Sequence, residues 1–248
     1  MNKPYVGVTG VMDQRDGQIL ADSWDHPTHL LMVGVLATST TLNGGASTRY
    51  PNRYPVVSAI KDLWPRDPEG GHHPKTLNLI HYATKNKNTL ADQFKLLKSL
   101  AGPLCDGIQL NMIWPDVQDV IQARHLFNRV VLQLGPSAMK EAGNDPYKIA
   151  QWLTPYKGSI TDVLIDASGG KGVPINVAKA HSIAKAVRDM YPDFGLGVAG
   201  GLCAPMVPTV LPLLKDFPDM SFDAEGRIRD LKDNLDLDLS QQYLKAFC

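Results

Sequence analysis

The chain has few cysteines and no excess charge of either sign. It holds 3 cysteines in 248 residues, with no CxxC pair, so neither a disulfide framework nor a zinc knuckle is expected. The 25 Lys and Arg residues are balanced by 25 Asp and Glu residues. Nucleic acids and anionic membranes attract proteins with a basic excess, so we expect neither as a partner.

Long hydrophobic runs are also missing. No apolar run approaches the roughly 20 residues that span a bilayer. The first residues, MNKPYVGVTG, lack the basic and then apolar pattern of a signal peptide. The few, widely spaced cysteines favour a reducing cytoplasm as the setting of the protein. What the chain does have is 44% hydrophobic residues, which is enough to build a core.

Short apolar runs, rich in β-branched residues, recur along the whole chain. Most are continuous rather than alternating, which is typical of strands buried on both faces in a parallel sheet. The predicted strands are Tyr5–Val8, Leu30–Leu36, Leu77–Tyr82, Gly107–Leu110, Val130–Leu134, Asp162–Ile165, Gly195–Val198 and Met220–Phe222.

Helical patterns fill several of the gaps between these runs. They are predicted at Thr89–Leu100, Pro115–His125, Asp145–Leu153, Asn176–Met190 and Pro205–Leu214. Eight strands alternating with helices predict one (β/α)8 TIM barrel over residues 1–248, with an open doubly wound sheet as the alternative. The polar segment Ser39–Thr76, after the second strand, is expected to form a long rim loop or lid.

An acidic residue ends the sixth predicted strand. Asp166 follows three apolar residues, where a carboxylate is unfavourable unless it has partners or a chemical task. It suits a general acid or base at the mouth of a barrel, and equally a residue that braces its loop. Gly200 and Gly201 follow the seventh strand, where backbone N–H groups can bind an anion.

Two segments resemble the strand-6 and strand-7 signature of phosphoribosylanthranilate isomerases: LIDASGGKG at 164–172 and VAGGL at 198–202. VTG at 8–10, STRY at 47–50 and GIQLN at 107–111 match the same family in the correct order. The resemblance implies a (β/α)8 barrel that catalyses an Amadori rearrangement. In that reaction a general acid opens the ring of a phosphorylated aminoaldose, and a general base removes a proton from C2.

The resemblance also implies roles for individual residues. Asp166 matches the general acid, and Arg49 matches the arginine that faces the substrate carboxylate. Gly200 and Gly201 match the pair that helps to hold the phosphate. The loop beside the acid is matched by Gly169, Gly170 and Gly172.

Two features depart from the family. Thr9 stands where the family has its cysteine base, and a threonine hydroxyl has far too high a pKa to act as a base unaided. After the eighth strand, Asp223 and Glu225 replace a small phosphate-binding turn. A phosphate there would need compensation from Arg227 or Arg229.

Several residues could supply the missing base. The candidates are Asp13, His81, Asp223 and Glu225. Asp13 lies on the loop after the first strand, where it could face Asp166 or be a solvated turn residue. Two facing carboxylates would separate their pKa values and so assign the acid and the base. His81 could point into the barrel mouth or pack against a helix.

Other polar residues could contact a ligand. Gln109, Asn111 and Gln133 could bind a polar substrate or satisfy one another inside the barrel. Lys171 could meet an anionic group or form the Schiff base of an aldolase. The adjacent pair His72–His73 is a poor chelator, so we expect no metal and no cofactor.

We therefore expect an enzyme that isomerises an anionic, phosphorylated or carboxylated, sugar-like small molecule. Asp166 would be the acid, with Thr9 or Asp13 opposite. The alternatives are an aldolase or lyase using the same barrel face, and a relative that binds its ligand without turnover. The chain could act as a monomer or as a homodimer.

Overall fold

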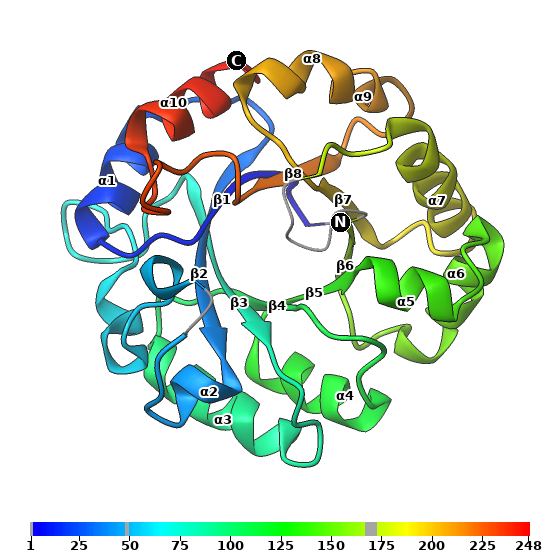
Figure 1. The fold of residues 1–248 in the computed structure, drawn as a ribbon, viewed down its shortest axis with the longest axis horizontal. Coiled ribbons are helices and arrows are strands. Elements are labelled where there is room, and N and C mark those ends of the chain that lie inside the picture. Colours follow the sequence, from blue (N-terminus) through cyan, green and yellow to red (C-terminus); the bar gives the residue numbers. More distant parts are fainter. Residues whose placement is uncertain (1, 48–49, 167–172) are drawn as a thin grey trace.

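The computed structural model describes residues 2–47, 50–166 and 173–248. Eight parallel strands close into a barrel in which each strand pairs with its neighbour in sequence, and the last pairs with the first. Figure 1 looks down this barrel, with the helices forming a ring outside it. The predicted single (β/α)8 barrel is confirmed.

Every predicted apolar run falls inside one strand, extended by at most two residues at an end. The strands are β1 (Tyr5–Thr9), β2 (Leu30–Thr38), β3 (Thr76–Ala83), β4 (Gly107–Leu110), β5 (Arg129–Leu134), β6 (Asp162–Asp166), β7 (Gly195–Ala199) and β8 (Met220–Ala224). Their outward side chains are apolar and pack against the helices, so both faces of the sheet are buried.

The helices lie between the strands and after the last one. They are α1 (Gln14–Ser23), α2 (Ser39–Leu42), α3 (Leu90–Ala101), α4 (Val117–Leu126), α5 (Pro136–Glu141), α6 (Pro146–Trp152), α7 (Val177–Met190), α8 (Val207–Val210), α9 (Leu213–Asp216) and α10 (Leu237–Lys245). The single helix predicted over Pro205–Leu214 is wrong. Pro212, which has no N–H to donate, stands between α8 and α9. Within the described ranges, no helix is both long and apolar enough to cross a bilayer.

The predicted long segment after β2 is present, but its second half is part of the core. It contains the short 3-10 helix η2 (Val57–Asp62), which packs against α3. Ile60 and Trp64 are fully buried there, and the Trp64 indole donates a hydrogen bond to the carbonyl of Ala101 at 2.8 Å. This part of the segment therefore covers the barrel in place of a longer helix after β2. Its role as a lid stays a prediction.

The barrel interior changes in polarity along its axis. At the amino end, Arg129 and Asp162 form a buried ion pair with N–O distances of 2.5 and 2.9 Å. A cluster of apolar side chains follows, made of Tyr5, Met32, Leu77, Leu79, Val131, Leu164 and Ala199. At the carboxyl ends of the strands the inward side chains are polar: Thr9, His81, Gln109, Gln133, Asp166 and Asp223. Polar groups buried at that end need partners or a ligand.

Gly34 on β2 makes room for one of these polar groups. A Cβ at this position would lie 2.5 Å from Oγ1 of Thr9 on the paired strand. Only glycine lets the Thr9 hydroxyl occupy this space inside the barrel.

Candidate active site

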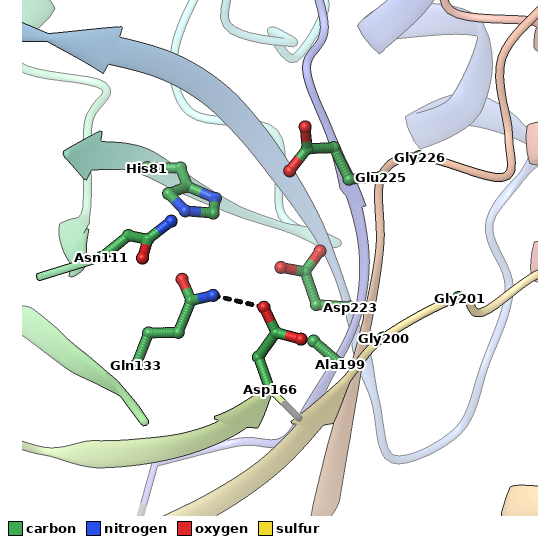
Figure 2. A pocket seen from close by; sticks show the side chains of 10 residues that line it. All are labelled: His81, Asn111, Gln133, Asp166, Ala199, Gly200, Gly201, Asp223, Glu225 and Gly226. Carbon is green, nitrogen blue, oxygen red and sulfur yellow. Dashed lines mark hydrogen bonds between the residues drawn. The ribbon is translucent and has the colours of Figure 1, made fainter. Parts of the chain in front are cut away.

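A cavity opens at the carboxyl ends of the strands, the face that carries the active sites of (β/α)8 enzymes. It holds about 410 Å³ of space, including its open mouth. Residues from six of the eight strands or the loops that follow them line it, as Figure 2 shows. They are His81, Asn111, Gln133, Asp166, Ala199, Gly200, Gly201, Asp223, Glu225 and Gly226.

Asp223 is a buried carboxyl in this cavity. The hydroxyl of Thr9 on the neighbouring strand donates a hydrogen bond to its Oδ1 at 2.8 Å. Burial raises the pKa of Asp223 to about 7; the hydrogen bond from Thr9 opposes this shift, and the charges of Glu225 and Asp166 add to it. A carboxyl with a pKa near neutrality can give and take a proton at physiological pH.

Asp166 lies beside Asp223, and both carboxyl groups point into the cavity (Figure 2). The Gln133 amide donates a hydrogen bond to Oδ2 of Asp166 at 2.7 Å. The Gln109 amide in turn reaches Oε1 of Gln133 at 3.3 Å and Nδ1 of His81 at 3.2 Å. This chain of neutral side chains fixes the position of Asp166 in the cavity.

His81 is the last member of this hydrogen-bonded series, and one of its ring nitrogens has no partner among the described residues. The Gln109 amide is a donor, so Nδ1 of His81 accepts and Nε2 carries the proton. Nε2 is buried and has no hydrogen-bond partner among the described residues. Burial lowers the pKa of His81, although the charges of Glu225 and Asp166 oppose this shift. A neutral imidazole with its N–H in the cavity is a donor for a ligand oxygen.

Glu225, at the rim, is held by an arginine that the sequence did not single out. Nη1 of Arg53 lies 2.8 Å from Oε1 of Glu225, and the same guanidinium makes two short contacts with Asp233. Its guanidinium also lies 4.1 Å from the ring centre of Tyr50. Arg53 thus links the segment after β2 to the loop after β8. The one sequence signal that could have identified Arg53 is a basic residue within the long polar segment after β2.

Gly200 and Gly201 line the wall after β7. Their φ angles of 121° and 59° lie in the region that favours glycine, so the chain turns sharply beside the cavity. Asn111 lines the opposite wall after β4. The cavity thus brings together Asp166, Asp223, Glu225, Asn111 and this glycine pair from the predicted site, with Thr9 and Gln109 bonded to its lining residues.

Three predicted residues lie elsewhere or play another part. Asp13 is exposed and caps α1, accepting a hydrogen bond from the Arg15 amide at 2.8 Å. Arg227 is exposed on the loop after β8 and does not line the cavity. Arg229 donates hydrogen bonds to the carbonyls of Thr9 and Gly10, at 3.0 and 3.3 Å. Arg49, Gly169, Gly170, Lys171 and Gly172 lie outside the described residues.

The described lining of the cavity has one sign of charge. It includes three carboxyl groups and neither lysine nor arginine. In the described ranges, no group of three His, Cys, Asp or Glu side chains has an arrangement that could hold a metal ion. The geometry suits proton transfer on a polar, uncharged part of a substrate, because the carboxyl groups would repel an anionic part.

No protein-family model and no curated protein matches this chain. Solved structures do match it. The native KDPGal structure is 12% identical with a TM-score of 0.57, over 100% of this chain and 95% of that one. The catalytic domain of a chitinase from Pyrococcus furiosus is 12% identical with a TM-score of 0.56, over 99% and 96%.

A third match is the carboxyl transferase domain of Rhizobium etli pyruvate carboxylase with pyruvate. It is 11% identical with a TM-score of 0.55, over 99% of this chain and 46% of that one. At such identities the likeness shows the barrel fold alone. None of these three is a phosphoribosylanthranilate isomerase, so the resemblance to that family rests on the sequence motifs.

Proposed function

We propose that the protein is an enzyme that isomerises a sugar-like carbonyl compound by acid/base catalysis in this cavity. The observation that carries the proposal is the pair Asp166 and Asp223, which face one cavity from β6 and β8. Asp223 has a pKa raised to about 7, mainly by its burial. Perturbed carboxyl groups in a cavity are typical of proton-transfer sites.

The reaction needs one proton acceptor and one proton donor on the same substrate. A carboxylate removes the proton from C2, the C–H electron pair forms a C1=C2 double bond, and the carbonyl electron pair moves to O1, which is protonated. In the second half C1 takes up a proton while O2 loses one and becomes the new carbonyl oxygen. One proton has moved from C2 to C1 and one from O2 to O1.

We assign the base to Asp223 and the acid to Asp166, so the reactive form of the pair carries one proton, on Asp166. The family resemblance supports Asp166 as the acid. Asp223 is our candidate for the missing base because it accepts a hydrogen bond from Thr9, the residue that stands where the family has its cysteine. The raised pKa makes an ionised Asp223 a stronger base than an ordinary aspartate.

His81 is proposed to bind the substrate oxygen on which negative charge develops. Its Nε2–H is buried and unpaired among the described residues, and a neutral imidazole can donate this bond without giving up a full proton. A preorganised donor in a buried site stabilises a developing oxyanion. Asn111 and Gln133 are available for the substrate hydroxyl groups.

An aldolase that acts through a Schiff base needs an amine at the reacting carbon. The described lining residues of the cavity include no lysine, and Lys171 lies outside the described residues. Trapping with borohydride in the presence of ribose 5-phosphate separates the two chemistries. An imine trapped on the protein would favour the aldolase.

The direct test is deuterium exchange in D2O, followed by proton NMR. Ribose 5-phosphate and its adduct with anthranilate are the probes. We expect the protein to exchange the C2 proton and to form the ketose. Asp223→Asn should slow this at least about 100-fold, because removal of a general base typically costs that much. Asp166→Asn should also slow ketose formation.

Asp116→Asn is the matched control, because Asp116 is an exposed cap of α4 and asparagine caps equally well. It should exchange the probes like the wild type. Equal exchange in wild type and Asp223→Asn would contradict the assigned base. A folded wild type that binds the probes without any exchange would contradict an isomerase and favour the ligand-binding alternative.

A further inference from the structure

A second hollow adjoins the cavity and shares two of its lining residues, Asn111 and Gln133. It lies between the loops that follow β3, β4 and β5, at residues 84–87, 111–113 and 133–138. It holds about 900 Å³ of space, including its open mouth. One molecule could therefore occupy both spaces, passing over the Gln133 side chain.

The two spaces differ in charge. The cavity is lined by Asp166, Asp223 and Glu225, and its described lining has no lysine or arginine. The hollow is lined by Lys85 and Lys87, and none of its described lining residues carries a carboxyl group. A substrate with one anionic end would be repelled in the cavity and attracted in the hollow.

The two lysines have different surroundings. The ammonium group of Lys87 is bonded to the carbonyl oxygens of Ile113 and Trp114, so it braces the loop after β4. Lys85 is exposed and makes no hydrogen bond or ion pair with any described residue. Lys85 is thus the cation that a ligand can recruit without breaking a contact of the protein.

Gly135 lines the hollow and has open space where a side chain would begin. A Cβ at this position would meet no atom within 4 Å. The backbone there is extended, with φ −79° and ψ 172°, so a larger residue can replace Gly135 without strain. A side chain placed at this position would fill space that a ligand needs.

We infer that the hollow binds the oxyanion end, a carboxylate or a phosphate, of the substrate whose carbonyl end lies between Asp166 and Asp223, with Lys85 as its cation. The inference rests on the proposed function, and it adds the substrate class: an aldose-like compound with its anionic group at the end remote from the carbonyl. Lys85 sets the specificity for charge and takes no part in proton transfer.

Binding is measured by NMR titration with three probes. Ribose 5-phosphate and glucuronate carry a phosphate or a carboxylate remote from the aldehyde, and ribose is the neutral control. The readouts are the side-chain amide of Gln133 and the backbone amide of Ser137, in the hollow. An anionic probe should shift both signals, and whichever anion binds more tightly identifies the preferred oxyanion.

Two variants and a control make the test specific. Lys85→Gln should weaken binding of the anionic probe about tenfold or more, with ribose unaffected. Gly135→Leu should have the same effect by filling the hollow while keeping Lys85. Lys157→Gln removes an exposed lysine near the start of β6, at the other end of the barrel, and should change nothing.

The inference is overturned if neither anionic probe shifts Ser137, or if binding survives both Lys85→Gln and Gly135→Leu. It is also overturned if the anionic probes shift Gly200 and Gly201 instead, which would place the anion on the β7 side. These outcomes do not affect the expected exchange of the substrate C2 proton, which depends on Asp223. Conversely, anion binding that depends on Lys85, without any exchange, would overturn the proposed function and keep the subsite.

Discussion

Thr9 donates a hydrogen bond to Asp223 at 2.8 Å, across the seam where the first and last strands close the barrel. Both side chains are buried, so the bond is a main control on the charge of Asp223. A hydroxyl that stands where a resembling family has its base thus acts here on a carboxyl group of the adjacent strand, 214 residues away in sequence.

Replacing Thr9 by valine should raise the pKa of Asp223 above its value of about 7. The change keeps the shape of the side chain but removes the hydrogen bond that stabilises the ionised carboxylate. Titration of the Asp223 carboxyl carbon by ¹³C NMR measures the shift. Thr9→Ser keeps a hydroxyl and should stay close to the wild type. Equal pKa values in the valine and serine variants would contradict this role of Thr9.

Asp223 should make the fold less stable as the pH rises from about 4 to about 7. Its folded pKa of about 7 lies above the value of about 3.9 in an unfolded chain, so in this window the folded state binds the extra proton. The stability contribution of the protonated form is complete below pH 4 and is lost as the pH rises through 7. The loss is about 4 kcal/mol.

Urea unfolding of wild type and Asp223→Asn from pH 4 to pH 8 checks this prediction. Asparagine does not titrate, so the variant should gain stability relative to the wild type as the pH rises. A difference between the two proteins that stays constant across this range would show that Asp223 ionises in the fold as it does in an unfolded chain.

Replacing Arg53 by methionine should affect both the rim loops and the cavity. Glu225 and Asp233 lose their cation, and we expect unfolding to become easier by about 2 kcal/mol, because the two carboxylates are partly exposed. The charge of Glu225 already raises the pKa of Asp223. Without Arg53 to compensate it, this charge should raise that pKa further. Urea unfolding and ¹³C titration measure the two effects.

Arg66→Met is the control for Arg53, since Arg66 belongs to the same segment and its guanidinium donates a hydrogen bond to the carbonyl of Gly70, with no carboxylate partner among the described residues. It should leave the pKa of Asp223 unchanged. If both arginine variants shift that pKa equally, the effect comes from a general change of the segment and not from the Arg53–Glu225 pair.

The ion pair at the amino end of the barrel should matter for stability and not for the cavity. Asp162→Asn leaves Arg129 buried without a countercharge, so we expect a loss of about 3–5 kcal/mol. The double variant Arg129→Met with Asp162→Leu should recover much of it, because no charge then stays buried. Urea unfolding compares them. A double variant less stable than Asp162→Asn would contradict this view of the pair.

The barrel could be predicted because its strands are buried on both faces, so their apolar runs are continuous and separate clearly from the polar loops. The helices were harder. The pattern of α10 gave no prediction, and Pro212 divided a helix that the apolar spacing at 205–214 had favoured. The core role of Trp64 was hidden because it stands in a segment whose composition is polar.

Only those site residues that directly follow an apolar strand run could be predicted from the sequence. Asp166, Asp223, Gly200 and Gly201 follow apolar runs, and the closure of the barrel brings them to one cavity. The contact between Thr9 and Asp223 depends on how β8 pairs with β1, and the ion pair of Arg53 depends on how two distant loops meet. Neither arrangement leaves a local pattern. The position of Asp13 after β1 suits a helix cap as well as a catalytic group, and in the structure Asp13 caps α1.

The most direct test of the acid/base site is the titration of the Asp223 carboxyl group in the wild type and in Asp166→Asn. We expect a pKa near 7 in the wild type and a lower value in the variant, because the charge of Asp166 helps to raise the pKa of Asp223. An Asp223 that titrates near 4 and does not respond to Asp166→Asn would contradict the proposed acid/base pair, since the two carboxyl groups would then not share one site.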